Sequence, residues 1–122
     1  MTSPFKEKKD LKRLINFFSF SIDGFKESYQ NDSAFRQEFI LCIILIPIGL
    51  LIGETGIQKA LLISSIIIIP LVELLNSSIN ATIDKISFEN QYLSKLSKFT
   101  GSTVVFLAIG NAFITWVLIL FF

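Results

Sequence analysis

Three nearly unbroken runs of Ile, Leu, Val and Phe occupy most of the last two-thirds of the sequence. The last run, from Ser102 to Phe122, carries no charged residue, and the two earlier runs contain Pro47 and Pro70. At about 1.5 Å per residue, helices of this length can cross a hydrocarbon layer roughly 30 Å thick. The pattern therefore predicts three transmembrane helices, over residues 34–53, 57–80 and 102–122.

Ahead of these runs, apolar residues recur at steps of three and four. They are Leu11, Leu14, Ile15, Phe18, Ile22 and Phe25. This spacing places them on one stripe of a helix, and polar residues such as Lys12, Arg13 and Asp23 lie off the stripe. The pattern predicts an amphipathic helix over residues 11–28. This helix can lie in the plane of a membrane surface, pack on the protein's own bundle, or do both.

The composition narrows the class of protein. With 122 residues and 52% hydrophobic content, the chain has room for one domain, residues 1–122, whose apolar surface must be covered by lipid. We therefore expect an all-α membrane protein. The formal net charge of +1 gives no reason to expect a nucleic-acid partner. The absence of histidine and the single cysteine, Cys42, argue against a His-dependent triad and a disulfide within the chain.

The distribution of charge predicts the orientation in the membrane. Ten of the eleven Lys and Arg residues lie ahead of about Phe39, where the apolar part of the first predicted span begins, or between the second and the third span, whereas the region of the turn between the first two spans holds only Lys59. Because positively charged segments stay on the cytoplasmic side, we expect a cytoplasmic N-terminus, a long cytoplasmic polar loop over 76–101, and a C-terminus on the opposite side.

A stripe of polar residues begins inside the second predicted span and continues beyond it. Its members are Glu73, Asn76, Ser77, Asn80 and Asp84, which share one helix face. An ionised carboxylate at the centre of a bilayer costs about 3 kcal/mol on insertion scales and less near an edge, so Glu73 should face protein or water. Glu73 is a candidate general base, and the alternative is a residue that only hydrogen-bonds a neighbouring helix.

Two further residues near this stripe suit an anion. Asn76 can donate a hydrogen bond to a phosphate, and Lys98 supplies a positive charge on the same predicted side of the membrane. No glycine-rich loop of the Walker type is present in the sequence. The residues by themselves are compatible with phosphoryl transfer, ion passage or helix packing, and their spacing does not choose among these.

Several motifs resemble those of one family. The motifs are Ala34-Phe35-Arg36-Gln37-Glu38, Leu61-Leu62-Ile63-Ser64-Ser65, Val72-Glu73-Leu74-Leu75-Asn76-Ser77 followed by Asp84, and Lys98 ahead of Gly101-Ser102. In order and spacing they resemble the small prokaryotic membrane diacylglycerol kinases, and the likeness extends from about Arg13 to Trp116. The resemblance implies a homotrimer in the bacterial cytoplasmic (inner) membrane. In such a trimer each chain contributes a surface helix and three spans.

The resemblance also implies a reaction and roles for particular residues. The family transfers the γ-phosphoryl group of ATP, as its magnesium complex, to a lipid hydroxyl, so diacylglycerol would give phosphatidic acid. By position, Glu73 matches the catalytic base. The nucleotide-binding positions match Arg13, Asn76, Glu89 and Lys98. The lipid-contacting positions match Ala34, Phe35, Arg36, Gln37, Glu38, Ser102 and Trp116.

Three positions depart from the family pattern. Asp32 and Asn80 stand where the family usually has two metal-binding glutamates, and Phe99 replaces an acidic residue after the lysine. An asparagine carbonyl can coordinate magnesium, but more weakly than a carboxylate. The leading hypothesis is an ATP-dependent diacylglycerol kinase that uses Mg²⁺. The alternatives are an undecaprenol kinase of the same family and a non-catalytic membrane scaffold.

Overall fold

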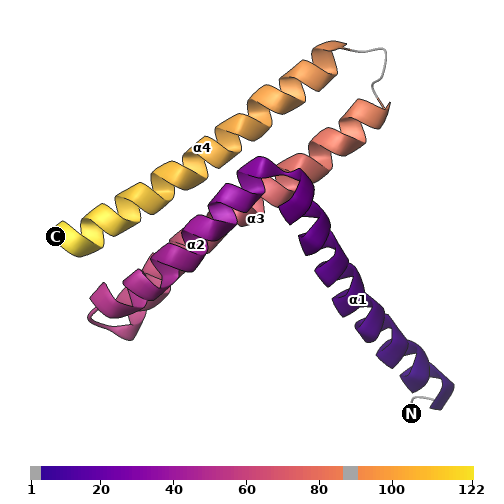
Figure 1. The fold of residues 1–122 in the computed structure, drawn as a ribbon, viewed down its shortest axis with the longest axis horizontal. Coiled ribbons are helices and arrows are strands. Elements are labelled where there is room, and N and C mark those ends of the chain that lie inside the picture. Colours follow the sequence, from indigo (N-terminus) through magenta and orange to yellow (C-terminus); the bar gives the residue numbers. More distant parts are fainter. Residues whose placement is uncertain (1–3, 87–90) are drawn as a thin grey trace. The chain divides into compact units, whose positions relative to one another are not determined.

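The computed structural model describes residues 4–86 and 91–122 and contains only helices over these ranges (Figure 1). Helix α1 spans Pro4–Asn31, α2 spans Ser33–Ile52, α3 spans Gly56–Ile86 and α4 spans Gln91–Phe121. The prediction of an all-α protein is confirmed. The chain divides into two compact units, Met1–Arg36 and Gln37–Phe122.

The first unit consists of α1 and the first turn of α2. Asp32 separates the two helices, and its Oδ1 accepts a hydrogen bond of 3.1 Å from the backbone N–H of Phe35. This N-cap satisfies one of the donors that the first turn of a helix leaves without an intrahelical partner. The ring of Phe35, only 2% exposed, meets the ring of Phe25 edge-on at 5.8 Å. The contact fastens the start of α2 to the end of α1.

Residues 53–55 connect α2 to α3 in a tight turn of the second unit. Thr55 Oγ1 accepts from the N–H of Gln58 at 3.1 Å, and Gln58 Oε1 accepts from the N–H of Glu54 at 2.9 Å. This reciprocal pairing is a close variant of the capping box. A Cβ atom at Gly53 would lie 2.6 Å from the Cγ of Lys59, so only glycine fits at the end of α2 without a shift.

Three of the described helices, α2, α3 and α4, are long and apolar enough to cross a membrane. Within one chain, only 17% of the most apolar window of α2 is buried, against 33% for α3 and 11% for α4. In water such exposure of apolar surface would be strongly unfavourable, whereas in lipid it costs little. The protein is therefore a membrane protein with three helices able to span the bilayer.

The core of the second unit lies where these three helices meet. Its buried members are Cys42, Ile66, Ile69, Ala108 and Ala112, with Leu45, Ile46, Val72 and Trp116 packed against them. The two alanines let α4 approach α3 closely, as small residues do in membrane helix pairs. Figure 1 shows α3 and α4 side by side and antiparallel.

Pro70 interrupts the backbone hydrogen bonding of α3. Because proline has no N–H, the carbonyl of Ile66, four residues earlier, loses its usual helical donor. In the structure the thiol of Cys42 on α2 donates to this carbonyl at 3.5 Å. The Ile66 carbonyl, which would otherwise lack a hydrogen-bond donor in apolar surroundings, thus receives one from the neighbouring helix.

Residues 76–86 and 91–101 are helical, which corrects the prediction of a long polar loop over 76–101. Helix α3 continues to Ile86 and α4 already begins at Gln91. The polar residues of this stretch repeat at helical steps and bond across the two helices, so polarity here indicates a helix pair beyond the apolar spans and not a coil.

Candidate functional site

Glu73 lies on α3 and is 9% exposed, although its helix is one of the predicted spans. Among the described residues, the buried polar or charged side chains are Ser65 and Glu73. Ser65 donates to the carbonyl of Leu62 in its own helix at 2.9 Å, as an ordinary helical serine does. Glu73 is thus the one buried ionisable acid found, in the part of the chain described, inside an apolar span. Its burial agrees with the expectation that it faces protein and not lipid.

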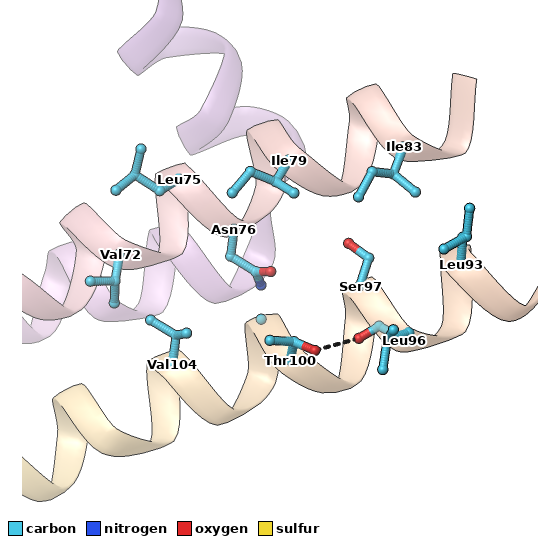
Figure 2. A pocket seen from close by; sticks show the side chains of 11 residues that line it. Val72, Leu75, Asn76, Ile79, Ile83, Leu93, Leu96, Ser97, Thr100 and Val104 are labelled. Carbon is cyan, nitrogen blue, oxygen red and sulfur yellow. Dashed lines mark hydrogen bonds between the residues drawn. The ribbon is translucent and has the colours of Figure 1, made fainter. Parts of the chain in front are cut away.

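Asn76 follows Glu73 by nearly one helical turn, and its side chain points from α3 toward α4 (Figure 2). Its Oδ1 accepts a hydrogen bond of 3.2 Å from the Nδ2 of Asn80. A Cβ atom placed on Gly101 of α4 would overlap Asn76 Oδ1 and would lie 2.5 Å from its Cγ. The amide group of Asn76 therefore occupies space that any other residue at position 101 would fill.

Two interhelical hydrogen bonds extend the polar contacts of Asn76 and Asn80 along α3 and α4. We call this row of polar residues the polar strip. The hydroxyl of Ser97 on α4 donates to Asn80 Oδ1 at 2.7 Å. The hydroxyl of Ser94, one turn earlier on α4, donates to Asp84 Oδ1. Ser94 and Ser97 were not predicted as site residues, because only the antiparallel pairing of α4 with α3 places them opposite the polar stripe.

A groove of about 480 Å³ lies beside this strip, between α3 and α4. Its polar lining comes from Asn76, Ser97 and Thr100. The remaining lining is apolar apart from the backbone of Gly101: Val72, Leu75, Ile79, Ile83, Leu93, Leu96 and Val104. Figure 2 shows Asn76 and Ser97 projecting from the two facing helices. The hydroxyl of Thr100 is engaged by the carbonyl of Leu96 at 2.7 Å, which leaves Asn76 and Ser97 to give the groove its polar character.

The two residues after Ser97 differ in their contacts. Lys98 is exposed on α4, so its ammonium group is accessible to a soluble anion. Phe99 is also exposed, and the Nζ of Lys95 lies 5.8 Å from the centre of its ring. The aromatic side chain of Phe99 therefore makes a cation–π contact and places no carboxylate next to Lys98.

Other predicted nucleotide and metal positions lie in the first unit or outside the described residues. Arg13 is exposed on α1 and, with Lys9 and Lys12, lines a hollow on that helix. Asp32 caps α2 through Oδ1. Glu89 lies outside the described residues. The structure therefore brings Asn76 and Asn80 together on α3, opposite Ser97 of α4, and Glu73 lies nearly one helical turn before Asn76 on the same helix.

Of the predicted lipid-contacting positions, Ala34–Glu38 form the first turns of α2. Arg36 donates through Nη1 to the carbonyl of Tyr29 at 3.4 Å, within the first unit. Ser102 is exposed on α4. Trp116 packs against the core and donates through Nε1 to the carbonyl of Leu62 on α3 at 3.2 Å. In this chain Trp116 thus joins α4 to α3.

The described residues offer few ligands for magnesium. Within residues 4–86 and 91–122, no three His, Cys, Asp or Glu side chains form a group that could hold a metal ion. Oδ1 of Asp32 accepts the capping hydrogen bond, and Oδ1 of Asn80 accepts from Ser97. Magnesium in phosphoryl-transfer sites is bound by one or two carboxylates together with substrate phosphates. The described residues of a single chain therefore do not fit a magnesium ion held by the protein alone.

Comparisons with known proteins all point to one family. The family model described as prokaryotic diacylglycerol kinase matches residues 19–120. The diacylglycerol kinase of Pseudomonas aeruginosa is 40% identical over 118 residues, which cover 97% of this chain and 96% of the relative. The diacylglycerol kinase of Haemophilus influenzae is 42% identical over 92% of this chain and 95% of the relative. That of Escherichia coli K12 is 37% identical over 88% of each chain.

Proposed function

The chain belongs to the prokaryotic diacylglycerol kinase family, and from this premise we propose that it transfers the γ-phosphoryl group of MgATP to the hydroxyl of diacylglycerol. The family resemblance predicted from the sequence motifs is confirmed, and so is the prediction of a lipid kinase. The relatives match the chain over nearly its whole length, and each bears the name diacylglycerol kinase, which favours this acceptor over undecaprenol.

The observation that carries the mechanism is the burial of Glu73 within a helix able to span the membrane. A buried carboxylate there is costly, and such residues usually serve a function. In the proposed step Glu73 accepts the proton of the diacylglycerol hydroxyl as that oxygen attacks the γ-phosphorus. The bond from the γ-phosphorus to the oxygen bridging it to the β-phosphorus breaks, and ADP and phosphatidic acid are the products.

Binding of the two substrates is assigned to the residues around Glu73. Asn76 and Lys98 would donate to phosphate oxygens, one from the groove and one from the exposed face of α4. Arg13 and Glu89 remain predicted nucleotide positions, and Ala34–Glu38, Ser102 and Trp116 remain predicted lipid positions. Phosphoryl transfer needs positioning and charge neutralisation more than covalent help from the protein. Asn76 and Lys98 would therefore contribute most of the rate enhancement.

We further propose the setting in which the reaction takes place. Magnesium arrives bound to the phosphates of ATP, and Asp32 and Asn80 stay predictions as its protein contacts. The protein lies in the bacterial inner membrane with a cytoplasmic N-terminus, where ATP is available, and the amphipathic part of α1 lies along the membrane surface. The homotrimer stays a prediction that rests on the family resemblance.

The test is a phosphoryl-transfer assay in lipid bilayers with labelled ATP, with diacylglycerol and undecaprenol offered separately. Glu73→Gln keeps the size of the side chain and removes the base, so kcat should fall by about 10²–10⁴-fold. Glu54→Gln, in the exposed turn after α2, is the matched control and should transfer at the wild-type rate. Transfer that survives Glu73→Gln would disprove the base assignment. A wild type that phosphorylates neither lipid would favour a scaffold.

A further inference from the structure

Ser97 of α4 and Asn80 and Asn76 of α3 are linked by two hydrogen bonds, in which each residue donates to the next. Ser97 donates its hydroxyl proton to Asn80 Oδ1, so the other end of that amide, Nδ2, is the end that faces Asn76. Asn80 Nδ2 in turn donates to Asn76 Oδ1. An asparagine amide has one oxygen acceptor and one NH₂ donor group, so fixing one end fixes the other. The orientation of Asn76 is therefore set by a hydroxyl on the facing helix.

The Nδ2 group of Asn76 is therefore a donor that points away from Asn80. We call the hydrogen-bonded chain Ser97–Asn80–Asn76 the relay. Because Asn76 Oδ1 is engaged by Asn80, the Nδ2 of Asn76 presents its two hydrogens to the remaining surroundings of the side chain. These surroundings include the groove that Asn76 lines. Gly101 limits the space on the α4 side, since a Cβ there would lie 3.1 Å from Asn76 Nδ2. The amide cannot turn over without breaking its bond to Asn80 and setting two donors against each other.

We propose that Asn80 and Ser97 are positioning residues that orient the amide of Asn76 with its NH₂ group toward the nucleotide phosphates. The proposal rests on the proposed function and assigns Asn80 a task other than holding metal. A carboxylate at position 80 could accept from Ser97 but could not donate to Asn76. An asparagine suits this relay because it can accept at one end and donate at the other.

The two roles for Asn80 lead to opposite results for one substitution. In Asn80→Asp the donor to Asn76 is replaced by a carboxylate oxygen, and the amide of Asn76 should turn to donate to it. The phosphate then meets a carbonyl oxygen in place of an NH₂ group. Loss of a hydrogen bond to a charged group corresponds to about tenfold or more in affinity, so we expect the KM for MgATP to rise by at least roughly that factor. A metal ligand at position 80 would instead be improved, and the KM would fall.

Ser97 provides the second arm of the test. Ser97→Ala leaves Asn80 free to take either amide orientation, so we expect a rise in the KM for MgATP of about two- to fivefold, smaller than for Asn80→Asp. Ser97→Thr keeps the hydroxyl and should restore the wild-type value. Ser78→Ala, an exposed serine on α3, is the matched control. In every variant the KM for diacylglycerol should stay unchanged, whereas a general loss of structure would alter both constants.

The affinity for a non-hydrolysable ATP analogue with magnesium is measured beside the transfer kinetics. If the wild type binds and transfers but Asn80→Asp shows unchanged or tighter MgATP binding, the relay is overturned and the kinase stands. If the wild type neither binds nor transfers, both proposals fail. Weaker MgATP binding in Asn80→Asp and Ser97→Ala, with rescue by Ser97→Thr, supports the relay.

Discussion

Replacing Gly101 by alanine tests the contact between α3 and α4 at Asn76. The added Cβ would overlap Asn76 Oδ1 and would lie 2.5 Å from its Cγ. Carbon atoms in good contact stand about 3.5–4.0 Å apart, so the side chain or the helix must move by at least about 1–1.5 Å. Either the helices separate at this level, which stretches the 2.7 Å bond from Ser97 to Asn80, or Asn76 changes rotamer and leaves Asn80. Both responses displace the amide that we assign to the phosphates.

Gly101→Ala should lower the stability only moderately and kcat/KM for MgATP strongly. Overpacking costs about 1–3 kcal/mol, and alanine recovers about 1 kcal/mol of helix propensity relative to glycine, so the free energy of unfolding should fall by no more than about 2 kcal/mol. A lost hydrogen bond to a charged phosphate is worth about 1.5–3 kcal/mol, or roughly 10- to 150-fold in kcat/KM for MgATP. Gly101→Ala should therefore produce a folded protein with severely reduced use of MgATP.

Labelled-ATP transfer in bilayers measures kcat/KM, and reversible unfolding by SDS in mixed micelles measures stability. The control is Gly110→Ala on the same helix, where an added Cβ has no neighbour within 4 Å among the described residues. In the double variant Gly101→Ala with Asn76→Ala the clash disappears, so stability should recover while activity stays low. Wild-type kcat/KM in Gly101→Ala would refute both the close contact and the assignment of Asn76.

Substitutions at three further positions test the packing. Cys42→Ala removes the donor to the Ile66 carbonyl and should lower the free energy of unfolding by about 1 kcal/mol, whereas Cys42→Ser should retain most of it, measured by SDS unfolding. Trp116→Phe removes the Nε1 donor to Leu62 and should cost about 0.6–1.7 kcal/mol in the same assay; no change would mean that this bond is not formed in the membrane. Phe99→Ala removes an exposed cation–π contact with Lys95 and should change stability by less than about 1 kcal/mol, with kcat unaltered; a large loss of transfer would give Phe99 a role in the site.

The sequence patterns predicted those parts of the fold that depend on local chemistry. Long apolar runs predict helices because backbone groups in lipid must bond within their own segment. A costly acid at Glu73 likewise predicts burial, and the structure buries it. The spacing from Asn76 to Asp84 predicted the helical continuation of α3, whereas the helical nature of residues 91–101 was missed because polarity was taken as a sign of a loop.

The partners of the polar stripe could not be predicted, because they depend on how α4 is aligned with α3. Small residues such as Ala108 and Ala112 help to set that alignment, and they lie about three and four helical turns beyond Ser97 on α4. The acceptors on Leu62 and Ile66 were also hidden from the sequence, since they are backbone carbonyls. Side-chain identity shows which groups can bond, while the packing of the helices decides which of them meet.

Pro70 lies less than one turn before Glu73. The segment of α3 that bears this acid therefore begins just beyond a missing backbone hydrogen bond. Bending of α3 at this level would draw the Ile66 carbonyl away from the thiol of Cys42, and α2 therefore braces the segment from the side. The orientation of the Glu73 carboxylate is thus set partly by α2. Substitutions on α2 that lie far from any substrate should accordingly change catalysis as well as folding.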